Sequence, residues 1–161
     1  MTTIQLLPFQ AQATEEIAQR FVNLWEDDNR PMETRRWSTP FYQALSALTG
    51  AGKTPILADA VAQIRAHLPV EPLVLWISKA KAVVDQAYTN FEAGGKYAHL
   101  IEGFVVTYLS ELTNEVLSDT STPLIVLSTV GTFNQKDKAD GTLRVHKVEE
   151  DKSSESLWSL L

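Results

Sequence analysis

Apolar and polar residues repeat along the chain with two different periods, and together these predict an α/β protein. Three apolar runs, at Phe41–Ser46, Leu73–Ser78 and Pro123–Leu127, are typical of buried strands. Apolar residues recur every three or four positions over Pro8–Trp25 and Pro55–Ile64, which predicts helices. Strands separated by helices favour a parallel sheet with right-handed crossovers.

The rest of the pattern predicts further elements. Apolar positions over Val83–Phe91 predict a helix that Gly94-Gly95 ends, Leu100–Val106 is expected to add a strand, and Leu109–Leu117 is expected to be helical. Residues 136–161 are charged and poor in apolar periodicity. Within this last segment we expect a short β-element at Leu143 and Val145, then an apolar tail at Leu157–Leu161.

Residues Ala47–Thr54 carry the strongest chemical signal, because Gly50, Gly52, Lys53 and Thr54 follow a predicted strand and open a predicted helix. The two glycines allow a loop whose N–H groups turn toward an anion, and the lysine can reach phosphate oxygens. The threonine hydroxyl can bind Mg²⁺. An ordinary Gly-rich turn would look similar, but the flanking elements favour a phosphate-binding loop. The candidate nucleotide-binding residues in it are Thr49, Gly50, Ala51, Gly52, Lys53 and Thr54, with Lys53 and Thr54 also the catalytic candidates.

The loop departs from the common P-loop pattern at its first position, where Ala47 replaces glycine. With alanine there, the loop resembles motif I of the superfamily 2 helicases and DNA translocases. Leu7-Pro8-Phe9-Gln10 is similar to the Q-motif of the same superfamily. The resemblance implies a RecA-like P-loop NTPase fold, ATP and Mg²⁺ as cofactors, and Gln10 as the residue that contacts adenine.

Two further segments resemble motifs that contact the nucleic-acid backbone in this superfamily. Lys79–Gln86 follows the second predicted strand, with Lys79 where proline is common, and Ser128–Asn134 follows the third. Within the superfamily, the runs that look most like the restriction subunit of type III restriction enzymes are Leu75–Ser78 with Val84–Gln86, and Leu127–Asn134. The resemblance implies DNA as a partner, a modification (methyltransferase) subunit as another, and DNA-backbone contacts from Ser78, Lys79, Lys81, Gln86, Ser128 and Thr129.

The resemblance also predicts how the chain is organised. It implies a Q-motif-like helix and loop over residues 1–40, a P-loop sheet core over 41–135, and a polar segment with an apolar tail over 136–161. A motor of this class needs an Asp-Glu-x-His box, and the late acidic residues Glu149–Asp151 and Glu155 lack the preceding strand that such a box requires. They are typical of a solvated loop. We therefore expect only the first RecA-like lobe, before the acidic box, and no turnover by this chain alone.

Three functions follow from these motifs. The first is the ATP-binding part of a DNA helicase or translocase motor. The second is a nucleotide-binding module without turnover, from a truncated reading frame, which the absent acidic box favours. The third is a small P-loop kinase, for which we identify neither an acceptor-binding lid nor catalytic arginines.

Length and composition indicate the number of domains, the location and the kinds of metal site to expect. A chain of 161 residues with 44% hydrophobic content suits one α/β domain, and no apolar run has transmembrane length. The sequence has no leader pattern, which predicts a cytoplasmic location without membrane association. It has no cysteine, and His67, His99 and His146 are too dispersed for a zinc cluster.

The net charge of −6 argues against binding nucleic acid by bulk electrostatics. A local basic patch remains open, because parallel strands place their carboxyl ends at one edge of a sheet. For each cation, ordinary solubilising charge is the alternative. The candidates that follow the second and third predicted strands are Lys79, Lys81, Lys96, Lys136, Lys138, Arg144 and Lys147.

Overall fold

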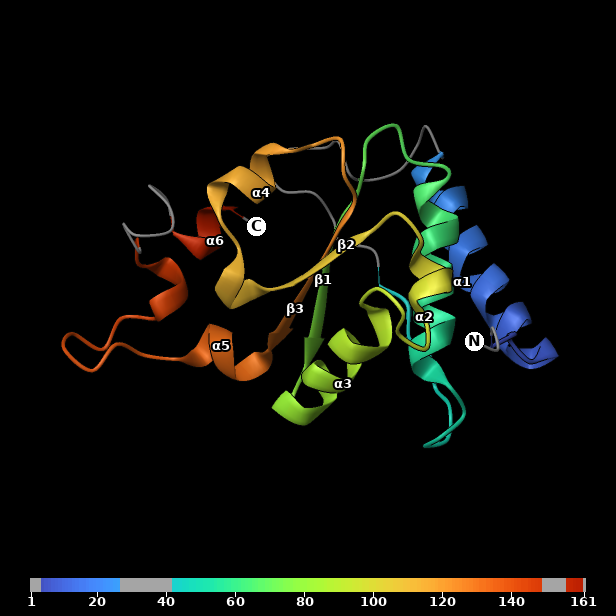
Figure 1. The fold of residues 1–161 in the computed structure, drawn as a ribbon, viewed down its shortest axis with the longest axis horizontal. Coiled ribbons are helices and arrows are strands. Elements are labelled where there is room, and N and C mark those ends of the chain that lie inside the picture. The colour runs from blue at the N-terminus through green and yellow to red at the C-terminus, as the bar shows by residue number, and fades with distance from the viewer. Residues whose placement is uncertain (1–3, 27–41, 149–155, 161) are drawn as a thin grey trace. The chain divides into compact units, whose positions relative to one another are not determined.

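A pair of helices and a three-stranded parallel sheet form the centres of two units of the chain (Figure 1). The computed structural model describes residues 4–26, 42–148 and 156–160. The helical unit comprises Met1–Pro69 with His99–Glu102, and the sheet unit comprises Val70–Ala98 with Gly103–Leu161. Each unit is described here by itself.

The helical unit is built from α1 (Pro8–Trp25) and α2 (Lys53–Arg65), which pack against each other. Proline at the first position of α1 suits a helix start, because its missing N–H would have no intrahelical partner there. The Thr14 hydroxyl is fully buried and donates to the Ile56 carbonyl at 3.2 Å, which joins the two helices. Small side chains at the buried positions of α1 allow this close approach: Thr14, Ala18 and Val22.

The sheet unit contains β1 (Leu73–Ser78), β2 (Val105–Tyr108) and β3 (Leu124–Thr129). Their order is β1-β3-β2, and both neighbours run parallel to β3. The carboxyl ends of all three strands therefore meet at one edge of the sheet. The predicted fold class, a parallel α/β sheet with flanking helices, is confirmed.

Strand β3 is the centre of the sheet unit, since its residues from Leu124 to Ser128 are all buried. On one face, Leu124 and Val126 form a core with two leucines that follow β2, Leu109 and Leu112. Helix α3 (Lys81–Phe91) packs against the sheet, and its Phe91 ring meets Trp76 of β1 edge-on at 5.1 Å. A strand buried on both faces has to be largely apolar, which explains the continuous run from Leu124 to Leu127.

Short elements complete the two units. Lys136 and Leu143 form an isolated antiparallel bridge, as do Val148 and Ser156. The apolar tail expected near the end of the chain contributes a short helix. The short elements are η2 (Ala98–Ile101), η3 (Leu109–Glu111), α4 (Asn114–Ser118), α5 (Val130–Asn134), η4 (Arg144–His146) and α6 (Leu157–Leu160).

The predicted strand at Phe41–Ser46 is wrong. Phe41 lies outside the described residues, and residues 42–48 are neither strand nor helix. The Tyr42 side chain is 83% exposed and that of Leu48 is 84% exposed. A strand needs a neighbour that pairs with its N–H and C=O groups, and the described part of the helical unit has no strand.

Two other predicted elements start and end elsewhere. The strand expected at Leu100–Val106 is displaced, because Gly103 adopts a φ of 85° and separates η2 from β2. The helix expected at Leu109–Leu117 is two elements, because Thr113 starts α4 by accepting a hydrogen bond from the Val116 N–H at 3.4 Å.

The β-element expected at Leu143 and Val145 is only partly present. Leu143 forms the bridge to Lys136, whereas Val145 lies in η4 and is buried. The alternating apolar residues therefore predicted the bridge at Leu143 but not the helical turn that contains Val145.

Leu124→Ala should destabilise the sheet unit by about 2–5 kcal/mol, because it leaves a cavity beneath the central strand. Its matched control is Leu73→Ala, since Leu73 is the β1 partner of Leu124 in the register but is 42% exposed. We expect a loss below about 1 kcal/mol for the control. Urea unfolding followed by tryptophan fluorescence compares the two, and equal losses would contradict a core centred on β3.

Candidate functional site

The glycine-rich loop has the backbone that its sequence predicts. Gly50 has a φ of 86° and Gly52 a φ of 83°, both in the left-handed region that favours glycine. The Ala51 N–H donates to the Leu48 carbonyl at 3.1 Å, which closes a turn. Gly52 is the N-cap of α2, so Lys53 is the first residue of the helix. The loop therefore leads directly into a helix N-terminus, where the helix dipole favours an anion.

The Lys53 ammonium lies on the loop that precedes it. Its Nζ donates to the Ala47 carbonyl at 2.7 Å and to the Leu48 carbonyl at 3.0 Å. Both acceptors are neutral, so an anionic phosphate can replace them with stronger, charge-assisted hydrogen bonds. The side chain is exposed and thus accessible to such a ligand.

Gln10 connects α1 to the loop. Its carboxamide oxygen accepts from the Leu7 N–H at 2.9 Å, and its Nε2 donates to the Ala51 carbonyl at 3.0 Å. A Cβ placed on Gly52 would collide with the same Nε2 atom. The structure therefore brings Gln10 together with the loop, and only glycine at position 52 leaves room for it.

Thr54 lies in the first turn of α2, half-buried, next to Lys53. Among the described residues, no group of three or more His, Cys, Asp or Glu side chains could hold a metal ion. One hydroxyl next to a phosphate-binding loop fits Mg²⁺ held largely by nucleotide phosphates and water. Pro55, the next residue, is tolerated because the N–H groups of a first helical turn lack intrahelical partners.

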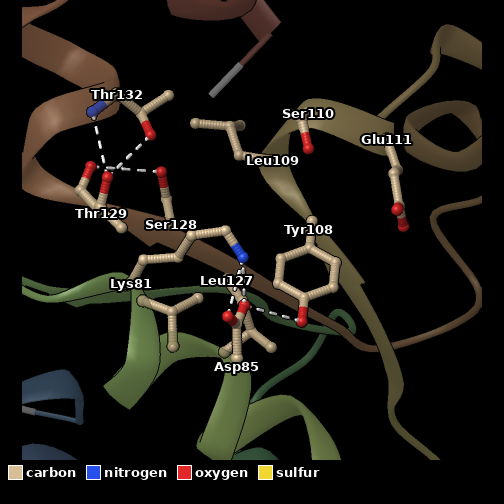
Figure 2. Close-up of a pocket in the computed structure, with 11 residues that line it drawn as sticks. Lys81, Asp85, Tyr108, Leu109, Ser110, Glu111, Leu127, Ser128, Thr129 and Thr132 are labelled. Carbon is tan, nitrogen blue, oxygen red and sulfur yellow. Dashed lines mark hydrogen bonds and ion pairs between the residues drawn. The ribbon is translucent and has the colours of Figure 1, made fainter.

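A pocket of about 410 Å³ opens in the sheet unit at the carboxyl ends of the strands (Figure 2). It combines an apolar floor with hydroxyl and charged groups. Its residues come from the start of α3, the end of β2 with η3, and the end of β3 with α5. They are Lys81, Val84, Asp85, Tyr108, Leu109, Ser110, Glu111, Leu127, Ser128, Thr129 and Thr132.

One side of the pocket is a chain of polar contacts between Lys81, Asp85 and Tyr108 (Figure 2). The Lys81 ammonium donates to both Asp85 oxygens, at 2.8 and 2.7 Å, and the Tyr108 hydroxyl donates to Asp85 at 3.2 Å. The hydrogen bond from Lys81 lowers the pKa of Asp85. Burial, together with the Asp85 carboxylate, raises the pKa of Tyr108. The Tyr108 ring also stacks on Tyr88 at 4.7 Å, which fixes its position.

The other side of the pocket is formed by hydroxyl groups at the end of β3. The Thr129 hydroxyl accepts from the Thr132 N–H at 3.2 Å and caps α5. The Thr129 and Thr132 hydroxyl oxygens lie 3.1 Å apart, and the Ser128 hydroxyl donates to the Thr129 carbonyl at 3.4 Å. Hydroxyl groups can donate to a phosphate or accept from a sugar without adding charge.

The predicted DNA-contact residues are only partly brought together. Lys81, Ser128 and Thr129 line the pocket. Ser78 ends β1 and Lys79 follows it, but neither lines the pocket, nor does Gln86, which is exposed on α3. Sequence reasoning missed several lining residues, of which Asp85 has a recognisable signal four positions after Lys81, the spacing of a helical ion pair.

Two of the basic residues that follow the strands, Lys147 and Lys96, have partners within the fold. Lys147 bridges two carboxylates, Asp137 at 2.9 Å and Asp140 at 2.7 Å, and its hydrogen bonds raise its pKa while lowering that of Asp140. Lys96 lies 5.1 Å from the centre of the Tyr97 ring. With Lys81 also paired, the cations after the strands do not add up to a uniformly positive patch.

Two remaining predictions concern the late acidic residues and membrane association. The acidic residues Glu149–Asp151 and Glu155 lie outside the described residues. In the described part of the chain, no helix has both the length and the apolar character needed to cross a membrane.

A glycine-rich loop that opens a helix is typical of P-loop NTPases, and a parallel α/β sheet, here in the other unit, is typical of their fold. A comparison with protein families identifies the group more closely: the model of the type III restriction enzyme res subunit matches residues 3–157, and the chain belongs to this family. This confirms the resemblance inferred from the motifs. The chain matches no curated protein and no solved structure.

Gly52→Ala should destabilise the helical unit more than Gly50→Ala. Both alanines would have to adopt a positive φ, at a cost of roughly 1–2 kcal/mol. Only the Cβ at position 52 also displaces the Gln10 amide from Ala51, since position 50 is open. In a Gln10→Ala background, the difference in unfolding free energy between Gly52→Ala and Gly50→Ala should disappear. Denaturant unfolding of the four variants measures it, and a difference that persists without the Gln10 side chain would refute the contact.

Lys81→Ala should raise the pKa of Asp85 toward its ordinary value of 3.8, because the principal hydrogen bond that lowers it is lost. A depressed carboxyl pKa stabilises the fold fully above about pH 4, and this contribution is lost as pH falls through the folded-state pKa. The variant should lose that acid-dependent contribution. A ¹³C NMR titration of the Asp85 carboxyl tests this, with Lys96→Ala as the control that should leave it unchanged.

Proposed function

We propose that the chain is the ATP-binding part of a DNA helicase or translocase motor, in which ATP hydrolysis drives DNA binding or movement. The observation that carries the proposal is the loop in which Gly50 and Gly52 have positive φ and Lys53 opens α2. Membership of the res subunit family supports the same activity.

In the proposed nucleotide site, each side chain has a distinct task. The loop N–H groups and the Lys53 ammonium bind the phosphates, exchanging the Ala47 and Leu48 carbonyls for anionic oxygens. The Thr54 hydroxyl holds Mg²⁺. Gln10, already at the loop through Ala51, contacts the adenine edge with its carboxamide. Bound ATP supplies the phosphoanhydride whose hydrolysis powers the motor.

The proposed DNA contacts lie at the carboxyl edge of the sheet. Lys81, Ser128 and Thr129 line one pocket there, where an ammonium and hydroxyl groups can bind phosphate and sugar. Such contacts position a strand without reading its sequence. Ser78, Lys79 and Gln86 extend this proposed surface outside the pocket. We further propose a cytoplasmic location and a modification subunit as partner, both on the basis of the family.

Lys53→Ala should weaken binding of a fluorescent ATP analogue by roughly 1.5–3 kcal/mol, because a charge-assisted contact with phosphate is lost. Lys138→Ala, which removes an exposed lysine of the sheet unit, is the matched control and should change little. Equal affinities for the wild type and Lys53→Ala would refute the nucleotide site.

Gln10→Ala should weaken ATP binding more than GTP binding, because its carboxamide is proposed to contact the adenine edge. Gln12→Ala removes a carboxamide from the same helix, where it donates to the Glu16 carboxylate at 3.1 Å, and should affect both nucleotides equally. Competition titrations with the two nucleotides measure the ratio. Parallel losses for ATP and GTP in Gln10→Ala would leave Gln10 as a support of the loop alone.

A further inference from the structure

The pocket of the sheet unit carries little positive charge for a site that would bind phosphate. Lys81 is the one cation among its lining residues, and two carboxylates, Asp85 and Glu111, line the same space. The whole chain carries a net charge of −6, so no bulk positive field compensates. A DNA strand would therefore depend on how available the Lys81 ammonium is.

The Lys81 ammonium is already paired. It donates to both oxygens of Asp85 on the same helix, and the Tyr108 hydroxyl, at the end of β2, donates to one of these oxygens (Figure 2). The pair is well exposed, with 79% of the Lys81 side chain and 42% of the Asp85 side chain accessible to solvent. Exposed pairs of this kind are weak enough for a phosphate to displace the carboxylate.

We propose that Asp85 competes with the nucleic-acid phosphate for the Lys81 ammonium and so sets the affinity and salt dependence of DNA binding at this pocket. This inference rests on the proposed function. When DNA binds, Lys81 turns to a phosphate and Asp85 keeps its hydrogen bond from Tyr108. Asp85 thereby limits how tightly the pocket holds a strand.

Competition between Asp85 and phosphate predicts an unusual salt dependence of DNA binding at the pocket. A lysine that neutralises a phosphate normally releases a counterion from the nucleic acid, which steepens the salt dependence of binding. Here the freed Asp85 carboxylate attracts a cation from solution at the same time. The second effect offsets part of the first, so Lys81 contributes less to the salt dependence as long as Asp85 is charged.

The test is fluorescence anisotropy of a labelled single-stranded DNA oligonucleotide with the 161-residue chain over a range of KCl concentrations. Asp85→Asn removes the charge and keeps the shape. We expect about two- to fivefold tighter binding at low salt. We also expect the slope of log affinity against log salt to steepen by at most about 0.7, the full value for one phosphate contact on a single strand.

Two further variants show whether the gain passes through Lys81. Adding Lys81→Gln to Asp85→Asn should abolish both the tighter binding and the steeper slope. Glu92→Gln removes one negative charge at the C-cap of the same helix, outside the pocket lining, and should reproduce neither effect. Asp85→Ala repeats the test without a carboxamide that could still contact Lys81, and circular dichroism verifies that each variant is folded.

The outcomes separate this inference from the proposed function. If the wild type binds DNA but neither Asp85→Asn nor Asp85→Ala binds more tightly, the competition is refuted while the DNA-binding function stands. The competition is equally refuted if Glu92→Gln gives the same gain, or if the gain survives the loss of Lys81. If neither the wild type nor any variant binds the oligonucleotide, with or without an ATP analogue, the proposed DNA-binding function itself fails.

Discussion

Parallel pairing of β3 with a strand on each side is the constraint on which the sheet unit depends. The pairing places the ends of β1, β2 and β3 at one edge, and burial of β3 on both faces fixes which elements cover it. Asp85 on α3 and Tyr108 at the end of β2 are 23 residues apart, yet they meet because of this order. The pocket is thus a consequence of strand order, and its polar groups are those that happen to follow each strand.

The helical unit depends on the loop before α2 and on its contact with Gln10. The loop before α2 needs two residues at positive φ, and the second of these, Gly52, also leaves space for Gln10. Because Gln10 simultaneously holds the start of α1 through the Leu7 N–H, the start of α1 and the loop share one side chain. The buried bond from Thr14 to Ile56 then fixes the two helices next to that contact.

The sequence predicted those features whose causes are local. The glycine-rich loop, α1, α2 and β1 were predicted because their determinants lie within consecutive residues, and β3 because a strand buried on both faces is largely apolar. The failed strand at Phe41–Ser46 has the same apolar character but no neighbouring strand in the described part of its unit, and composition does not reveal a pairing partner. Tyr108 was missed for a related reason, because Gly103 displaces β2 from its expected position.

Two of the lysines that follow the strands are already paired with carboxylates, which bears on how the proposed DNA partner would bind. Lys81 and Lys147 are each held by carboxylates, so these two of the cations that follow the strands are paired within the fold. On the proposed function, a strand of DNA would be bound by exchange, with phosphates replacing carboxylates as partners of a lysine. Replacing a carboxylate by a phosphate, or the reverse, changes the free energy little because exposed ion pairs are weak. A motor that moves along DNA has to release each phosphate that it binds, and weak exchangeable contacts meet that requirement better than a strongly positive surface would.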